Sequence, residues 1–79
     1  MEEIKKIIAQ TFNCEQKSIK ENSGPDTIEE WDSLGHFNLI NNIEEYYGVM
    51  LSTNDIFKIK SVKDISIILD NYNLSNSED

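Results

Sequence analysis

Apolar side chains recur every three or four residues in three stretches of the chain, and this spacing places them on one face of an α-helix. The pattern predicts helices over residues 2–13, 33–47 and 61–72. The residues that define the three apolar faces are Ile4, Ile7, Ile8 and Phe12; Leu34, Phe37, Ile40, Ile43 and Tyr47; and Val62, Ile65, Ile68, Leu69 and Tyr72. No stretch alternates apolar and polar residues with period two for long enough to predict a strand. The pattern is therefore typical of an all-α protein.

Polar residues mark the ends of two of these helices. Asp32 is a favoured N-cap residue for the middle helix, and Gly48 is well placed as the residue that follows its last turn. Ser61 and Asp64 have the spacing of a capping box, which predicts the start of the last helix.

A short helix and a long loop are predicted between these segments. Residues 53–59 carry apolar side chains behind a polar start, which predicts one short helix. Residues 14–31 are irregular and include the turn signal SGPD at 23–26. We expect this loop to be ordered, because it carries apolar residues that can anchor it in the core. These residues are Ile19, Ile28 and Trp31.

The predicted architecture is a four-helix bundle, with three main helices and one short helix around a single core. The 79 residues are enough for one small domain, which we place at residues 1–73, followed by a polar tail over residues 74–79. A domain of this size buries only about 60% of its unfolded surface, so we expect modest stability.

The composition narrows the functional classes. The net charge is −8, with 15 acidic and 7 basic residues, which argues against binding to nucleic acid or to an anionic membrane. The single cysteine excludes an internal disulfide, and no Cys/His cluster offers a metal site. The first residues lack the features of a secretory signal, and no stretch approaches transmembrane length. We therefore expect a cytoplasmic protein.

Asp32-Ser33-Leu34 is the candidate functional site. Ser33 lies where a loop turns into the middle helix, so its hydroxyl is expected to be exposed and to point outward. The N-terminus of a helix presents unpaired N–H groups and about half a positive charge, which stabilise a phosphate by on the order of 0.3–1 kcal/mol. The position therefore suits a covalently attached phosphate better than catalysis by the serine. An ordinary helix cap is the alternative interpretation of the same tripeptide.

His36, Cys14 and Trp31 could each have a functional or a structural role. His36 lies three residues after Ser33, but no third group is placed to orient its ring as a base. A small hydrolase is therefore the least favoured function, no catalytic residue is predicted, and we expect His36 to be exposed or to face a partner. Cys14 is expected to replace a small apolar residue near the end of the first helix. Trp31 is expected to be a core or loop anchor.

The chain resembles the acyl carrier proteins. Residues 31–40 (WDSLGHFNLI) and residues 43–48 (IEEYYG) are similar to the modification-site helix of that family. The resemblance extends over roughly residues 2–72, because the first helix, the long loop, the short third helix and the helix that starts at residues 61–65 (SVKDI) follow in the family's order.

The resemblance implies that Ser33 bears a 4′-phosphopantetheine arm, derived from coenzyme A and joined through a phosphodiester. The terminal thiol of the arm would hold acyl groups as thioesters. Asp32 and Leu34 would help a transferase to recognise the serine, and Glu44 and Glu45 match acidic positions that meet basic partner enzymes. On this hypothesis the protein is a monomeric acyl carrier and not an enzyme.

The implied partners are a phosphopantetheinyl transferase, an acyl- or aminoacyl-activating ligase, and an acyltransferase or condensing enzyme, as in fatty acid or secondary metabolite biosynthesis. Phe37 fits either the core or a partner contact. Gly35, Asn38 and Asn41 are small or neutral where many fatty-acid carriers have acidic or apolar residues, which we expect to affect partner choice. The nearest alternative is an aminoacyl carrier, of the D-alanyl or peptidyl type, with the same arm. An acidic helical adaptor that binds its partners non-covalently is an alternative of a different class.

Overall fold

The computed structural model describes residues 2–72, which form four α-helices, one 3-10 turn and no β-strand. The helices are α1 (Glu2–Phe12), α2 (Ser33–Tyr47), α3 (Thr53–Lys58) and α4 (Val62–Asn71), and the 3-10 turn is η1 (Gln16–Ser18). The predicted all-α fold is confirmed, and each predicted helix agrees with the observed one to within one residue at either end. The predicted tail, residues 74–79, lies outside the described residues.

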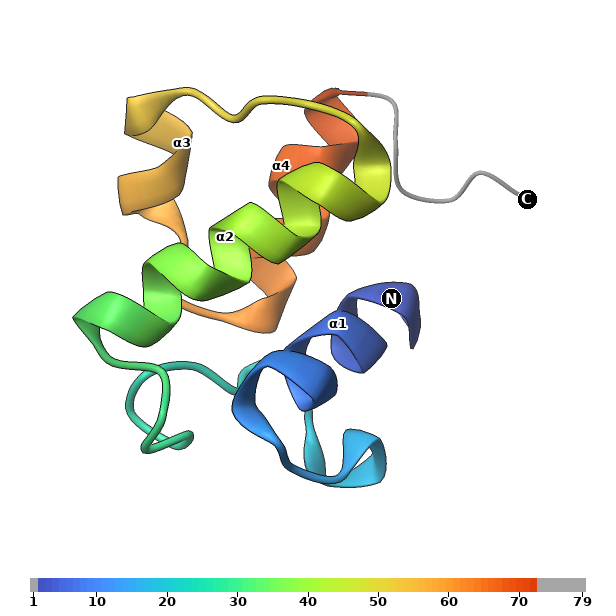
Figure 1. The fold of residues 1–79 in the computed structure, drawn as a ribbon, viewed down its shortest axis with the longest axis vertical. Helices are drawn as coiled ribbons and strands as arrows, with labels where there is room; N and C mark the ends of the chain where they lie inside the picture. Colours follow the sequence, from blue (N-terminus) through green and yellow to red (C-terminus); the bar gives the residue numbers. More distant parts are fainter. Residues whose placement is uncertain (1, 73–79) are drawn as a thin grey trace.

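The helix α2 crosses the middle of the molecule, with α1 on one side of it and α3 and α4 on the other (Figure 1). The side chains with 0% exposure come from α1, α2 and α4: Ile8, Leu39, Ile43, Val62 and Leu69. The long loop between α1 and α2 covers the end of the bundle at which α2 begins (Figure 1). The start of α2 is therefore held by both the core and this loop.

The first turn of α2 faces solvent, which differs from the predicted apolar face. Leu34 is 78% exposed and Phe37 is 49% exposed, whereas Gly35 between them is buried. The backbone carbonyl of Glu30 and the ring of Phe12 lie against Gly35, so this side of the turn faces the core. Leu34 therefore does not belong to the buried face that the apolar spacing indicated. Of the two alternatives for Phe37, the structure excludes the core, and the partner contact stays a prediction.

The long loop is ordered against the core, as predicted. Ile19 and Trp31 are 3% and 1% exposed, and the partly buried Ile28 packs against the same core. The ring of Trp31 stacks on that of Phe12, with 5.7 Å between the ring centroids. The segment that leads into α2 is therefore attached to α1 by buried apolar surface.

Backbone groups of this loop complete the first turn of α4. The N–H of Val62 donates to the carbonyl oxygen of Ser23 at 2.9 Å, and the N–H of Lys63 donates to that of Glu21 at 2.9 Å. The first N–H groups of a helix have no acceptor within the helix itself. The loop supplies these acceptors, so α4 and the loop depend on each other.

The predicted capping box of α4 is present in a modified form. The Ser61 hydroxyl accepts a hydrogen bond from the N–H of Asp64 at 3.3 Å, and the Asp64 carboxylate accepts one from the N–H of Lys60 at 3.0 Å. In the usual box the second bond goes to the cap residue itself. A Cβ on Gly24 would lie 2.2 Å from the carbonyl oxygen of Lys60, so the loop approaches this turn closely only because residue 24 is glycine.

Tyr47, in the last turn of α2, is held against the first turn of α1. Its side chain is half-buried, and its phenol donates a hydrogen bond to the Glu3 carboxylate. Burial, followed by the negative charge of Glu3, raises the pKa of Tyr47 to about 12. The neutral phenol is therefore part of the contact between the two helices.

Replacing Gly35 by Ala should lower stability, although a Gly→Ala change inside a helix usually raises it by roughly 0.5–1 kcal/mol. The new Cβ would lie 2.1 Å from the carbonyl oxygen of Glu30 and 2.9 Å from the ring of Phe12. Overpacking of this kind costs about 1–3 kcal/mol, which urea unfolding followed by circular dichroism measures. Asn38→Ala is the matched control at an exposed position of the same helix, and it should leave stability unchanged or slightly higher. A gain for Gly35→Ala equal to that of the control would contradict the packing.

Stability should fall as the pH rises from about 10 to about 12, because in this window the unfolded chain loses the Tyr47 proton while the folded chain, in which the pKa is raised, keeps it. Tyr47→Phe has no proton to lose and should show a smaller fall. Tyr46→Phe is the control and should keep most of the fall, because burial and the charge of Glu3, the two largest causes of the raised Tyr47 pKa, stay in place. The measurement is the free energy of unfolding at a series of alkaline pH values. Equal curves for the two variants would contradict the assignment.

Candidate functional site

Ser33 is the first residue of α2, and its side chain is exposed. Asp32 caps the helix, as predicted: its Oδ1 accepts a hydrogen bond from the N–H of Gly35 at 2.9 Å, and its backbone oxygen accepts one from the N–H of His36 at 2.7 Å. Within residues 2–72, the Ser33 hydroxyl has no hydrogen-bond partner. The hydroxyl is therefore accessible and is not needed to cap the helix.

A hollow of about 470 Å³ opens beside Ser33. Its wall is mostly aromatic and aliphatic, and it is built from the loop before α2, the first turns of α2, and the end of α3 with the residues that follow it. The lining residues are Pro25, Trp31, Asp32, Ser33, His36, Phe37, Phe57, Ile59 and Lys60. Phe57 of α3 is 65% exposed at this hollow. Asp32, Ser33 and Phe37 were predicted to belong to the site, but no local pattern indicates that residues 57–60 lie beside them.

His36 joins the loop, α2 and α3 through two hydrogen bonds. Its Nδ1 accepts from Nε1–H of Trp31 at 2.9 Å, and its Nε2 lies 2.9 Å from the carbonyl oxygen of Ile56. Since a carbonyl oxygen only accepts, Nε2 carries the hydrogen and the ring is the neutral Nε2–H tautomer. The rings of His36 and Trp31 also stack, with centroids 6.3 Å apart. We refer to these two hydrogen bonds as the His36 latch.

The His36 latch leaves the ring no free nitrogen for Ser33. A general base needs a basic atom within hydrogen-bond reach of the hydroxyl that it deprotonates. Both nitrogens of His36 are instead directed at Trp31 and Ile56. The expectation that His36 is exposed was wrong, because one accepted and one donated hydrogen bond hold the ring half-buried. That His36 faces a partner stays a prediction. The geometry thus does not favour a Ser33–His36 catalytic pair.

The two acidic residues of α2 differ in their contacts. Glu44 is half-buried, and its Oε2 accepts a hydrogen bond from the N–H of Leu51 at 2.9 Å, which fixes the segment between α2 and α3. Gly48 ends α2 in the left-handed conformation, with φ of 69°, as its predicted position after the last turn requires. Glu45 is exposed. Of the two carboxylates, Glu45 is therefore the one that is free for a partner.

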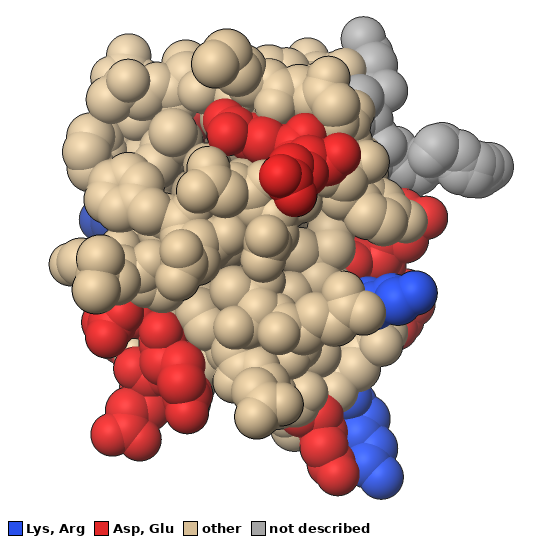
Figure 2. Space-filling model, in the orientation of Figure 1, with Lys and Arg blue, Asp and Glu red and all other residues tan. Residues whose placement is uncertain are grey.

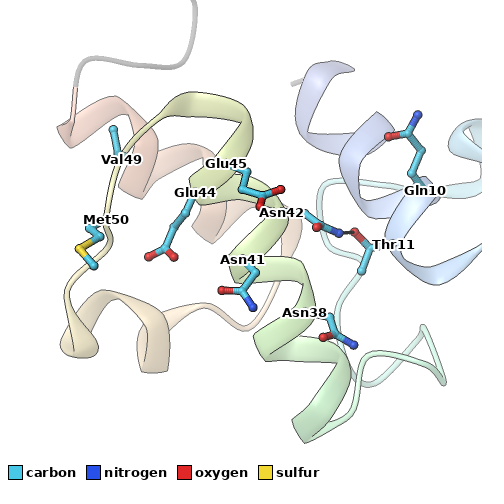
Figure 3. Close-up of a pocket in the computed structure, with 9 residues that line it drawn as sticks. All are labelled: Gln10, Thr11, Asn38, Asn41, Asn42, Glu44, Glu45, Val49 and Met50. Atoms are coloured by element: carbon cyan, nitrogen blue, oxygen red, sulfur yellow. Dashed lines mark hydrogen bonds between the residues drawn. The ribbon is translucent and has the colours of Figure 1, made fainter.

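A second hollow, of about 680 Å³, lies along the outer face of α2 and is lined mainly by polar side chains (Figure 3). The residues are Gln10, Thr11, Asn38, Asn41, Asn42, Glu44, Glu45, Val49 and Met50. Asn42 Nδ2 donates to the Thr11 hydroxyl at 2.8 Å, which links α2 to α1. The other amides that line the hollow, on Gln10, Asn38 and Asn41, are exposed. The hollow is wide and open, and it does not contain Ser33.

Gly35, Asn38 and Asn41, the three positions expected to affect partner choice, differ in their exposure. Asn38 and Asn41 are exposed on α2, where a partner can reach them. Gly35 is buried, and even a methyl group there would collide with the carbonyl of Glu30. The small size of Gly35 therefore serves packing between α2 and the preceding loop, whereas an effect of these positions on partner choice stays a prediction.

The charges are distributed unevenly along the chain and over the surface. Residues 21–57 contain no Lys or Arg. On the face of the molecule shown in Figure 2, acidic groups gather in separate places with uncharged surface between them. Lys60 is the one basic residue that lines the hollow beside Ser33. Ser33 therefore has a positive charge near it in an otherwise acidic protein.

Cys14 packs partly buried against the core, as predicted for a substitute for a small apolar residue. Burial, and then the charge of Glu30, raises the pKa of its thiol, which disfavours the reactive thiolate. Within residues 2–72, no group of three or more His, Cys, Asp and Glu side chains is arranged to hold a metal ion. Among the same residues, no helix has both the length and the apolar character needed to cross a membrane.

Comparisons with family models and with curated proteins found no match to this chain. The function must therefore be inferred from the geometry around Ser33. That geometry combines an exposed serine hydroxyl, a helix that begins at this residue, and an apolar hollow with one lysine.

Replacing His36 by Leu should destabilise the protein by about 1–3 kcal/mol, because Nε1–H of Trp31 and the carbonyl of Ile56 would lose their partner inside the fold. Urea unfolding followed by circular dichroism is the measurement, since the fluorescence of Trp31 is itself expected to change. Leu34→Ala is the control at a neighbouring position that is 78% exposed, and it should stay within about 0.5 kcal/mol of the unsubstituted protein. An equally small effect for His36→Leu would show that the latch contributes nothing to stability.

Proposed function

We propose that the protein is an acyl carrier that holds acyl groups as thioesters on a 4′-phosphopantetheine arm attached to Ser33. The observation that carries the proposal is the accessible Ser33 hydroxyl at the start of α2, with Asp32 as a separate cap and both nitrogens of His36 bonded elsewhere. A serine that is modified by a separate transferase must be accessible to that enzyme, but it needs no neighbouring base, because the transferase activates the hydroxyl. The resemblance of residues 31–40 to the modification-site helix of acyl carrier proteins agrees with this geometry.

The residues around Ser33 fit a phosphodiester. The first N–H groups of α2 and the positive end of the helix lie at this position, and Lys60 lines the adjoining hollow. In the proposed modification, the Ser33 oxygen forms a bond to the pantetheine-bearing phosphorus of coenzyme A, and the bond from that phosphorus to the bridging oxygen breaks. Adenosine 3′,5′-bisphosphate leaves, and the serine proton is transferred to the medium. When bound, the arm supplies a terminal thiol that forms the thioester.

The surface of α2 supports transient docking to partner enzymes. Leu34 and Phe37 offer exposed apolar surface next to Ser33, and Glu45 offers a free carboxylate further along the helix. The fitting partners are a phosphopantetheinyl transferase, an activating ligase, and an acyltransferase or condensing enzyme with basic docking surfaces. Electrostatic attraction makes such encounters fast and sensitive to salt, which suits a monomeric carrier in the cytoplasm that must leave each partner.

The aminoacyl carrier is the second candidate function, and the surface of α2 is the observation that favours it. Asn38 and Asn41 are exposed and neutral at positions where many fatty-acid carriers are acidic or apolar. A partner that recognises this face meets amide groups rather than charges. Incubating the modified protein with fatty acids or amino acids and the matching activating ligases distinguishes the two kinds of cargo.

Incubation with coenzyme A and a phosphopantetheinyl transferase should increase the intact mass by one phosphopantetheine group. Ser33→Ala should abolish the increase while the protein stays folded, because Asp32 and not Ser33 caps α2. Ser52→Ala is the matched control: Ser52 is another exposed serine at the start of a helix, where it caps α3, so the variant should be modified normally. Intact-mass spectrometry measures all three proteins.

Two outcomes would contradict the proposal that the protein is a carrier modified at Ser33. Absence of any mass increase with several competent transferases would favour the non-covalent acidic adaptor, in which Asp32-Ser33 is only a helix start. A mass increase that persists in Ser33→Ala would move the attachment point to another residue.

A further inference from the structure

From the hollow beside Ser33 we infer a docking site for the proximal part of the phosphopantetheine arm, so that the arm lies against the protein between encounters. The inference rests on the proposed modification of Ser33. The ligand class is a phosphodiester that continues into a branched aliphatic and amide chain. Lys60 would meet the phosphodiester, and the rings of Phe37 and Phe57 would hold the aliphatic part.

Ser33 itself lines the hollow, so a group attached to its oxygen begins inside the site and not beside it. The tether makes occupation of the hollow an intramolecular event with a high effective concentration. The volume of about 470 Å³ lies within the range of pockets that bind small ligands, roughly 300–1,000 Å³. The size of the hollow and its position therefore agree with this occupant.

The charge and the exposed rings are placed as this ligand requires. Lys60 is the one basic residue that lines the hollow, and no Lys or Arg occurs in residues 21–57. Phe37 and Phe57 are 49% and 65% exposed at the same hollow, although neither is needed to fill the core. An occupant with a phosphate followed by an apolar chain explains this arrangement. The phosphate would meet the lysine, and the apolar chain would cover the exposed rings.

The inner wall of the hollow is closed toward the core. Trp31 is 1% exposed and hydrogen-bonded to His36, and Ile59 is 3% exposed. The His36 latch also ties this wall to the carbonyl of Ile56 in α3. An arm in the hollow thus rests on the outside of the bundle, with the buried Trp31 and Ile59 between it and the core.

Nuclear magnetic resonance spectra of the full chain before and after modification test this inference, with intact mass confirming the modification. Trp31 is the only tryptophan, so its indole N–H gives a single signal in the wall of the hollow. Modification should shift this signal and the backbone signals of Phe57 and Lys60. The shifts should be largely lost in Lys60→Gln and in Phe57→Ser, both of which change exposed side chains and should fold.

The controls are matched to these two variants. Lys63→Gln removes a neighbouring exposed lysine that does not line the hollow, and Met50→Ser removes an apolar side chain that is 84% exposed at the other hollow. Both should keep the shifts. Shifts confined to Ser33 and its neighbours in sequence would show a free arm, and shifts of the buried Leu39 and Ile43 methyl groups would show entry into the core; either result overturns the inference. A protein that gains no mass overturns the proposed function instead.

Discussion

The hydrogen bond from Trp31 to His36 is the contact on which the site depends. Trp31 is buried and stacks on Phe12 of α1, while His36 belongs to α2 and also bonds to the carbonyl of Ile56 in α3. One pair of side chains thus connects three helices and the loop that precedes Ser33. Buried polar groups are stabilising only when their partners are present, so this network specifies a single arrangement of the elements around it. Ser33 lies between Trp31 and His36 in the sequence, so the network holds the chain on both sides of the exposed serine.

The helices follow from local rules, and these could be predicted from the sequence. Apolar spacing located all four helices, and the caps at Asp32, Gly48 and Ser61 followed from the chemistry of their side chains and backbone. The position of Ser33 at a helix start was predictable for the same reason. Its exposure was also predicted, from its place where a loop turns into the helix.

Contacts between distant segments could not be predicted in the same way. Helical spacing shows that α2 is amphipathic, but the close approach of Glu30 and Phe12 to Gly35 decides which side of its first turn is buried. The partner of His36 in α3 is 20 residues away in the sequence, and no local pattern indicates it. Glu44 was interpreted as a surface charge, whereas its bond to Leu51 depends on how the chain turns after Gly48. The hollow beside Ser33 combines three segments, so it exists only in the folded protein.

The two hydrogen bonds from the first turn of α4 to the carbonyls of Ser23 and Glu21 couple the formation of α4 to that of the long loop. With 10 residues, α4 is shorter than the roughly 12–15 residues that an isolated helix needs to be even marginally stable in water. Its first turn has all of its hydrogen bonds only after the loop has closed on it, and in the sequence the loop is separated from α4 by α2 and α3. Contacts between positions so distant in the sequence form slowly, because the chain must lose much of its freedom before it gains them. We therefore expect the loop and α4 to form and to open together, as one cooperative unit.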